Sequence, residues 1–215
     1  MKTRPTSPNE DILAIREIME RSSKFLSING LAGVLAGIVA LVGAAFSWLI
    51  ILGAGRTTYG DLLQNVGDPA VAAAWMGLAL IAAIVLVFAV TGAVFFSHRK
   101  ARKAGQKLWT VSTRNLLVHF LIPLASGGIF VLILVFGNYL GLVPSAMLIF
   151  YGLSLVNAGK FTFGEIHSLG LTVIALGILA GFFPSYGLLF WAMGFGLMHI
   201  IYGSIMYHLR EKKGR

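Results

Sequence analysis

The sequence predicts an all-α integral membrane protein, a bundle of six transmembrane helices. Of its 215 residues, 57% are hydrophobic and only 12% are charged, whereas soluble domains carry about 25% charged residues. The apolar residues gather in runs of about twenty, the length that an α-helix needs to cross the hydrocarbon core of a bilayer. The basic residues gather between these runs, in the pattern that sets the topology of membrane proteins.

Residues 1–27 form a polar segment in which the sequence predicts an amphipathic surface helix. Ser7, Pro8 and Glu10 fit a capping box, with Ser at the N-cap and Pro at the first helical position. Because a long polar stretch precedes the first apolar run, the segment is not a signal peptide. The helix can lie on the membrane surface or pack on the loops of its own protein, and the sequence leaves both interpretations open.

The rest of the chain divides into a transmembrane domain and a short tail. The transmembrane domain covers residues 28–208, and residues 209–215 form a basic cytoplasmic tail. Pro123 lies inside the third apolar run and should kink that helix, because proline cannot donate a backbone hydrogen bond. The predicted spans are residues 28–52, 70–96, 115–136, 142–157, 165–183 and 186–207.

The distribution of charge predicts the orientation of the chain. All of the 17 Lys and Arg residues except Arg56 lie in the N-terminus, segment 98–114, the stretch around Lys160 or the tail. With six spans these segments fall on one side of the cell membrane, and the positive-inside rule makes that side, with both termini, cytoplasmic. Read alone, segment 98–114 resembles a basic patch for lipid or nucleic acid, but its position explains its charge, and we predict no nucleic-acid partner.

Two pairs of glycines predict close contacts between helices. Gly33 and Gly37 in the first span, and Gly177 and Gly181 in the fifth, follow the small-xxx-small pattern that lets helix backbones approach each other. We interpret these glycines as packing positions inside one bundle, in preference to positions at a dimer interface. Similar glycine spacing in the first and fifth spans suggests a parallel internal repeat, although the abundance of glycine also explains it.

A polar cavity is the main hypothesis for a site. The interiors of the spans contain no Asp, Glu, Lys or Arg, so His199 is the ionisable residue closest to the membrane centre, and such residues are costly in hydrocarbon. The stretch 151–170 concentrates further polar residues near the cytoplasmic side. The candidate lining residues are Ser126, Tyr151, Asn157, Lys160, Glu165, His167, His199 and Tyr202.

Structural explanations also exist for these residues. Glu165 is favoured at a helix N-terminus by the helix dipole, and Lys160 can extend towards the head groups. For His199, packing against Tyr202 or a backbone carbonyl is the common structural outcome. The five histidines match no known metal-binding spacing, and the chain has no cysteine, so we predict neither a metal nor another cofactor.

Two segments carry a resemblance to other proteins. The sequence RSSKF before the first span and GFGLMHIIYG in the sixth resemble uncharacterised small bacterial six-span membrane proteins. This resemblance implies a six-helix fold and no particular activity.

Three functions remain open from the sequence. The leading hypothesis is a channel-like or transporter-like protein for a small solute or ion. The alternative is a sensor, assembly or accessory protein that acts through its helix faces and its N-terminal helix. The expected partners are membrane lipids and either a second copy or a membrane partner. The weakest is an intramembrane enzyme built on Ser126 and His199. Leu124 replaces the first glycine of the Gly-x-Ser-Gly motif of rhomboid-type proteases, so we predict that the protein is not an enzyme.

Overall fold

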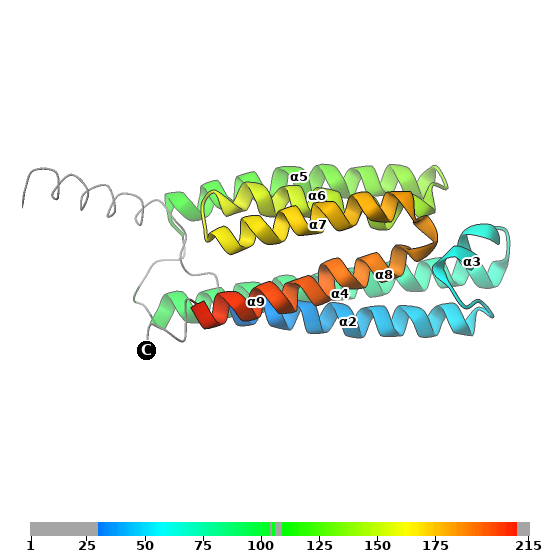
Figure 1. The fold of residues 1–215 in the computed structure, drawn as a ribbon, viewed down its shortest axis with the longest axis horizontal. Coiled ribbons are helices and arrows are strands. Elements are labelled where there is room, and N and C mark those ends of the chain that lie inside the picture. Colours follow the sequence, from blue (N-terminus) through cyan, green and yellow to red (C-terminus); the bar gives the residue numbers. More distant parts are fainter. Residues whose placement is uncertain (1–29, 104, 106–108, 210–215) are drawn as a thin grey trace, which may run out of the picture.

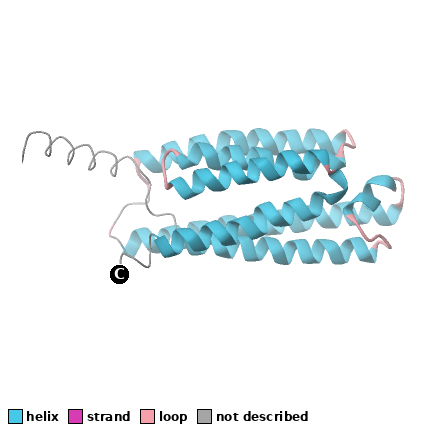
Figure 2. Ribbon diagram, viewed as in Figure 1, coloured by secondary structure: helices cyan, strands magenta, loops and turns pink. Residues whose placement is uncertain are grey.

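Residues 30–103, 105 and 109–209 are described from a computed structural model of the chain (Figure 1). All regular elements in these residues are helical, as Figure 2 shows. Within them, 6 helices are long and apolar enough to cross a membrane. The prediction of an all-α protein with six membrane-spanning helices is therefore confirmed. The predicted surface helix in residues 1–27 and most of the basic tail lie outside the described residues.

The first five spans are regular helices, and the sixth is assembled from several pieces. The first five are α2 (Gly30–Gly53), α4 (Pro69–Lys103), α5 (Val111–Phe136), α6 (Val143–Gly159) with the 3-10 turn η1 (Leu140–Leu142) before it, and α7 (Gly164–Phe182). The sixth span contains the 3-10 turn η2 (Pro184–Tyr186), the helix α8 (Gly187–Trp191), the π-helical segment η3 (Ala192–Met198) and the helix α9 (His199–Tyr207).

The predicted ends of two spans were wrong. The second span was predicted to end at residue 96, but α4 continues to Lys103. No glycine or proline interrupts this stretch, and basic residues in the last turn interact favourably with the helix dipole. The third span begins earlier than residue 115, because the Thr110 hydroxyl accepts a hydrogen bond from the backbone N–H of Thr113 at 3.2 Å and caps α5.

The loop between the first two predicted spans contains a short helix, α3 (Tyr59–Gln64), which was not predicted from the sequence. Thr58 and Asp61 form a capping box at its start. The buried Tyr59 hydroxyl donates to the carbonyl of Leu140 at 2.9 Å. Burial raises the pKa of Tyr59 well above its usual value, so the hydroxyl keeps its proton and this bond. Helix α3 is thereby attached to the turn that precedes α6.

The six spans form two layers of three (Figure 1). We call α2, α4 and the sixth span the α2 half, and α5, α6 and α7 the α6 half. The α4–α5 and α6–α7 connections lie at one end of the bundle, and α3, η1 and η2 lie at the other. We call the first the basic end, because the described Lys and Arg residues other than Arg56 lie in the last turns of α4, near the start of α5 or just after α6. We call the second the cap end.

Within each half, glycines bring helix backbones into direct contact. A methyl group added at Gly203 in α9 would lie 2.7 Å from the Val34 nitrogen and 2.8 Å from the Gly30 oxygen of α2. In the α6 half, a methyl group at Gly170 of α7 would lie 2.8 Å from the Gly152 oxygen of α6. Such spacing lets two helices approach more closely than larger residues allow.

The four glycines that the sequence singled out lie at these same two contacts. Gly33 and Gly37 of α2 face Gly203 and Gly196 of the sixth span. Gly177 and Gly181 of α7 face α6, where their nearest neighbours include Ile149 and Ser145 respectively. All four therefore pack against neighbouring helices of their own chain.

The two halves meet through larger side chains. Buried aliphatic residues of α6 and α7 pack against partly buried residues of the sixth span, two of them phenylalanines. The α6 and α7 residues are Leu148, Leu155, Leu169, Val173 and Ala180, and the sixth-span residues are Phe190, Phe195, Met198 and Tyr202. The sixth span thus contacts α2 through close backbone approaches and through side chains such as Trp191, and it contacts the α6 half mainly through side chains.

Candidate functional site

The buried histidine of the sixth span lies at the junction between the halves. His199 is 6% exposed and begins α9, immediately after the π-helical segment. Its Nδ1 lies 2.9 Å from the carbonyl oxygen of Gly194, five residues earlier, and its Nε2 lies 2.7 Å from the hydroxyl of Tyr151 on α6. A wide π-helical turn therefore precedes the ring, and one ring nitrogen bonds to a carbonyl inside that turn.

These two bonds determine where the imidazole carries its proton. A carbonyl oxygen can only accept, so Nδ1 of His199 is the protonated nitrogen and donates to Gly194. In the neutral ring Nε2 then accepts, and the donor is the Tyr151 hydroxyl. Every polar atom of the pair has a partner, which removes most of the cost of placing it in a membrane.

Aromatic rings surround the His199–Tyr151 pair. The two rings themselves stack with centroids 5.4 Å apart, and Phe195 lies 5.0 Å from the Tyr151 ring. Trp191 packs on Phe195 at 5.2 Å, and Phe120 of α5 approaches the edge of Tyr151 at 6.3 Å. Apolar surroundings of this kind strengthen a satisfied hydrogen bond and make a broken one costly.

A second hydrogen bond joins the halves one helical turn further along the sixth span. The hydroxyl of Tyr202 lies 3.0 Å from Oγ1 of Thr172 on α7. Thr172 donates its own proton to the Ser168 carbonyl at 3.0 Å, so it accepts from Tyr202. Thr172 is not among the site residues predicted from the sequence, although a threonine within an apolar span is a known donor and acceptor between helices.

Ser126 does not belong to this site. Its hydroxyl donates to the Ile122 carbonyl of its own helix at 2.9 Å, on an exposed face of α5. Both nitrogens of His199 are engaged by Tyr151 and Gly194. The structure therefore does not bring Ser126 and His199 together as the enzyme hypothesis requires.

The remaining candidate residues lie towards the basic end. Asn157 follows Tyr151 by six residues on α6, which is about 9 Å along the helix axis. Lys160 is exposed just after α6, and Glu165 lies in the first turn of α7. Nδ1 of His167 lies 3.4 Å from the Val156 carbonyl. The predicted single lining is thus divided into the central group Tyr151, His199 and Tyr202 and a separate group at the α6–α7 connection.

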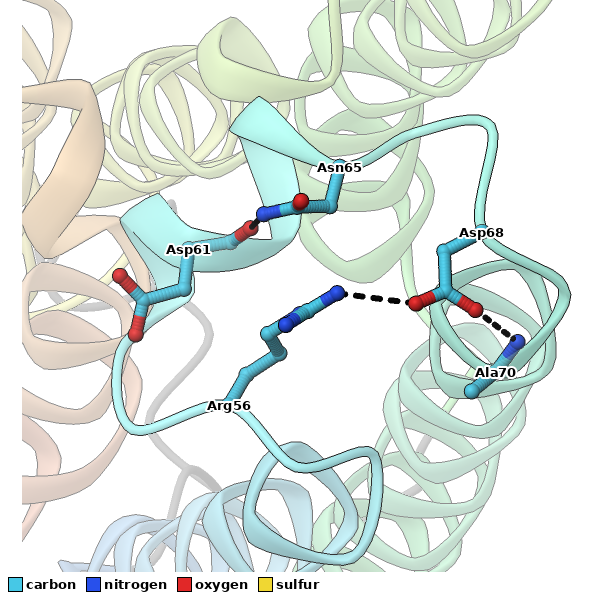
Figure 3. Close-up of polar contacts among 5 residues, drawn as sticks. All are labelled: Arg56, Asp61, Asn65, Asp68 and Ala70. Carbon is cyan, nitrogen blue, oxygen red and sulfur yellow. Dashed lines mark hydrogen bonds and ion pairs between the residues drawn. The ribbon is translucent and has the colours of Figure 1, made fainter.

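The cap end holds a polar network that the sequence analysis did not identify (Figure 3). Arg56 pairs with Asp68 at 2.8 Å, and the other carboxylate oxygen of Asp68 accepts from the backbone N–H of Ala70 at 2.9 Å. Asp68 thereby caps α4, whose first residue is a proline. The side chain of Asn65 donates to the Asp61 carbonyl at 2.8 Å. The Asp-Pro pair in the sequence was the available signal for this cap.

Asp61 stabilises the start of α3 through its charged form. Its Oδ2 accepts from the backbone and hydroxyl of Thr57 at 2.9 and 2.8 Å and from the backbone of Thr58 at 2.8 Å. These bonds, led by the Thr57 backbone, lower the pKa of Asp61 to about 2. The network is a structural cap for the loop.

Histidines outside the central pair have their own contacts. The His119 ring stacks on Phe161 at 5.0 Å, and Nδ1 of His208 bonds to the Ser204 carbonyl at 2.9 Å. In the described part of the chain, no group of three or more His, Asp or Glu residues is arranged to hold a metal ion.

Comparison with known proteins gives no relative for this fold. No family model matches the chain, and no match is found among curated proteins or solved structures. The evidence for function therefore comes from the arrangement of the chain's own residues.

Proposed function

We propose that this protein is a small transporter-like or channel-like membrane protein, which lets a small polar solute or an ion cross by movement of one half against the other. The observation that carries the proposal is the buried hydrogen bond between His199 and Tyr151, on opposite sides of the junction between the halves. Ionisable residues such as histidine inside transmembrane segments often mark substrate or ion pathways.

The packing supports movement between the halves and rigidity within them. Inside each half, contacts such as Gly203 with Gly30 and Gly170 with Gly152 join backbone to backbone. Backbone atoms cannot change rotamer, so these pairs should move as units. At the junction, side chains such as Phe195 and Met198 interlock, and such surfaces can adopt a second packing.

The form of the sixth span also supports the proposal. It contacts both halves, and its π-helical segment from Ala192 to Met198 interrupts the α-helix directly before His199. π-Helical turns occur often at functional sites, and interrupted helices form the substrate sites of many transporters. Small rotations at this segment would change the position of the imidazole.

The hydrogen bond between His199 and Tyr151 favours opening of the halves only when another polar group can replace it. Separation of the halves would break the bond between Tyr151 and Nε2 of His199, and a buried group without a partner costs about 1–3 kcal/mol. Water or a solute with hydroxyl, amide or amine groups can replace the lost bond. The same reasoning applies to Tyr202 and Thr172.

Flux through reconstituted vesicles tests the proposal. We expect vesicles that contain the protein to swell faster than empty vesicles for at least one member of a panel of ions, polyols, amides and amino acids. Tyr151→Phe should change that rate several-fold, whereas Ser126→Ala, on the exposed face of α5, should leave it unchanged. Equal rates with and without protein across the whole panel would contradict the proposal.

The proposal includes an orientation in the cell membrane. The described Lys and Arg residues other than Arg56 lie at the basic end, and the positive-inside rule favours the cytoplasm for that end. The alternative of an accessory protein with an exposed glycine face receives less support, because Gly33, Gly37, Gly177 and Gly181 all face helices of the same chain.

A further inference from the structure

Helix α4 carries a basic stripe on its outer face. Arg99, Arg102 and Lys103 are all exposed and follow Phe95 at intervals of four, seven and eight residues, which places the four residues on one side of the helix. Phe95 is 58% exposed, whereas Ala101 on the other side is only 1% exposed. The outer face of α4 therefore changes from apolar to cationic along its length.

Helix α5 begins with a similar face. Val111, Arg114 and Val118 are exposed and lie at intervals of three and four residues. Trp109, immediately before the helix, is 73% exposed. Tryptophan concentrates at the level of lipid head groups, so its position indicates that Arg114 lies close to that level.

The two stripes lie near each other and near the α6–α7 connection. Seven residue steps separate Lys103 from Thr110, so their Cα atoms lie no more than about 25 Å apart. The ammonium group of Lys100 in α4 lies 5.9 Å from the centre of the Phe163 ring, and His119 of α5 stacks on Phe161. The α6–α7 connection, which also holds the exposed Lys160, thus contacts both helices.

We propose that these side chains form a binding surface for anionic phospholipids in the leaflet that meets the basic end. We call it the basic rim, and it consists of Arg99, Arg102, Lys103, Arg114 and Lys160. Guanidinium groups bind phosphate with two parallel hydrogen bonds, and the exposed apolar residues below them suit the acyl chains. The proposal does not depend on transport.

The distribution of charge indicates that the partner is anionic and that it binds at the basic end of the protein. Among the described residues, Glu165 is the only acid near the basic end, whereas the cap end carries Asp61 and Asp68 with Arg56. The apolar surface directly below the arginines favours a lipid, because an inorganic ion or a nucleic acid has no acyl chains to cover it. A membrane-embedded helix face is also in permanent contact with lipid.

Thermal unfolding of the full chain in detergent provides the test. We expect saturable stabilisation by phosphatidylglycerol and a weaker effect from phosphatidylcholine. The triple substitution Arg99→Gln, Arg102→Gln and Lys103→Gln should weaken the apparent phosphatidylglycerol affinity at least tenfold, since each basic side chain near an anionic surface contributes about fivefold. Arg56→Gln removes a cation at the cap end and should leave the lipid response unchanged.

Further measurements distinguish phospholipid from inorganic phosphate and DNA as the ligand. Measurements on the unmodified protein test the proposal even if the triple variant does not fold. The response of the unmodified protein to phosphatidylglycerol should fall when sodium chloride is raised to about 1 M, because salt screens surface charges. Equal stabilisation by the two lipids, by inorganic phosphate or by a DNA duplex would overturn the proposal. A lipid response that is independent of salt would also overturn it.

Discussion

At the scale of single residues, the protonation state of His199 follows from its two partners. Gly194 can only accept and therefore fixes the proton on Nδ1, which leaves Nε2 to accept from Tyr151. Nitrogen-15 NMR of the labelled imidazole would show one protonated and one unprotonated nitrogen, with the protonated one assigned to Nδ1.

Removal of the Tyr151 hydroxyl should destabilise the fold. In Tyr151→Phe, Nε2 of His199 remains buried without its donor, and we expect a loss of about 1 kcal/mol in the free energy of unfolding, in line with hydrogen bonds between membrane helices. Reversible unfolding in mixed micelles measures this loss. The matched control is Tyr186→Phe at the exposed cap end, which should change stability by less than about 0.5 kcal/mol. Equal effects of the two substitutions would argue against a bond of this strength.

The carboxylate of Asp61 should make the cap end sensitive to acid. Its pKa in the folded protein is about 2, below the ordinary value of 3.8, so its ionised form stabilises the fold. This contribution is complete above the ordinary pKa and is lost as the pH falls from there towards 2. We expect the stability difference between the unmodified protein and Asp61→Asn to be constant near neutral pH and to shrink over this acidic range. A difference that does not vary with pH would show that the charge has no role.

At the scale of elements, contact between helices depends on the absence of a side chain at particular glycines. In Gly203→Ala the new methyl group would lie 2.7 Å from a backbone atom of α2, so the helices must separate. We expect a loss of about 1–3 kcal/mol, typical of overpacking. Gly128→Ala in α5 is the matched control, because a methyl group there meets nothing within 4 Å. It should be neutral or slightly stabilising, since alanine favours helix more than glycine does.

The spans differ in how much of their surface the protein itself covers. In the most apolar part of α2, 33% of the residues are buried, whereas the corresponding fraction is 6% in α4 and 11% in α5. Helices α4 and α5 therefore present most of their surface to the membrane, whereas the span that contains α6 is the most buried, at 44%. The buried pair accordingly includes Tyr151 of α6, and the rim residues other than Lys160 lie on the outward-facing helices α4 and α5.

At the scale of the whole molecule, the two halves should move as units. The chain has no cysteine, so spin labels can be attached at introduced cysteines without background. We expect the distance distribution between labels at positions 98 and 160, in different halves, to broaden in the double variant Tyr151→Phe and Tyr202→Phe. The pair at positions 118 and 160, within the α6 half, should keep its distribution. Unchanged distributions for both pairs would indicate that side-chain bonds do not hold the halves together.

The orientation of the molecule is a separate prediction. Single cysteines at Trp109, at the basic end, and at Asn138, in the turn between α5 and η1, report on opposite ends. We expect a membrane-impermeant maleimide to label position 138 on intact cells and to label position 109 only after the cells are opened. The reverse pattern would invert the assignment of sides.

The sequence by itself determined the six spans and singled out His199 as the ionisable residue expected closest to the membrane centre. Span length and composition are local properties, because each helix in a membrane satisfies its own backbone and needs only enough apolar residues. The same local reasoning misjudged the end of α4, where basic residues continue the helix to Lys103, and it overlooked α3.

Only the tertiary structure decided which polar residues meet. Tyr151 and His199 are 48 positions apart, and their encounter depends on how α6 and the sixth span are rotated about their axes. Those rotations follow from contacts on other faces, such as Gly203 against α2 and Gly170 against α6, and from the π-helical turn before His199. Apolar composition makes a helix span the membrane but carries no information about its rotation, so the partner of His199 could not be read from the spans themselves.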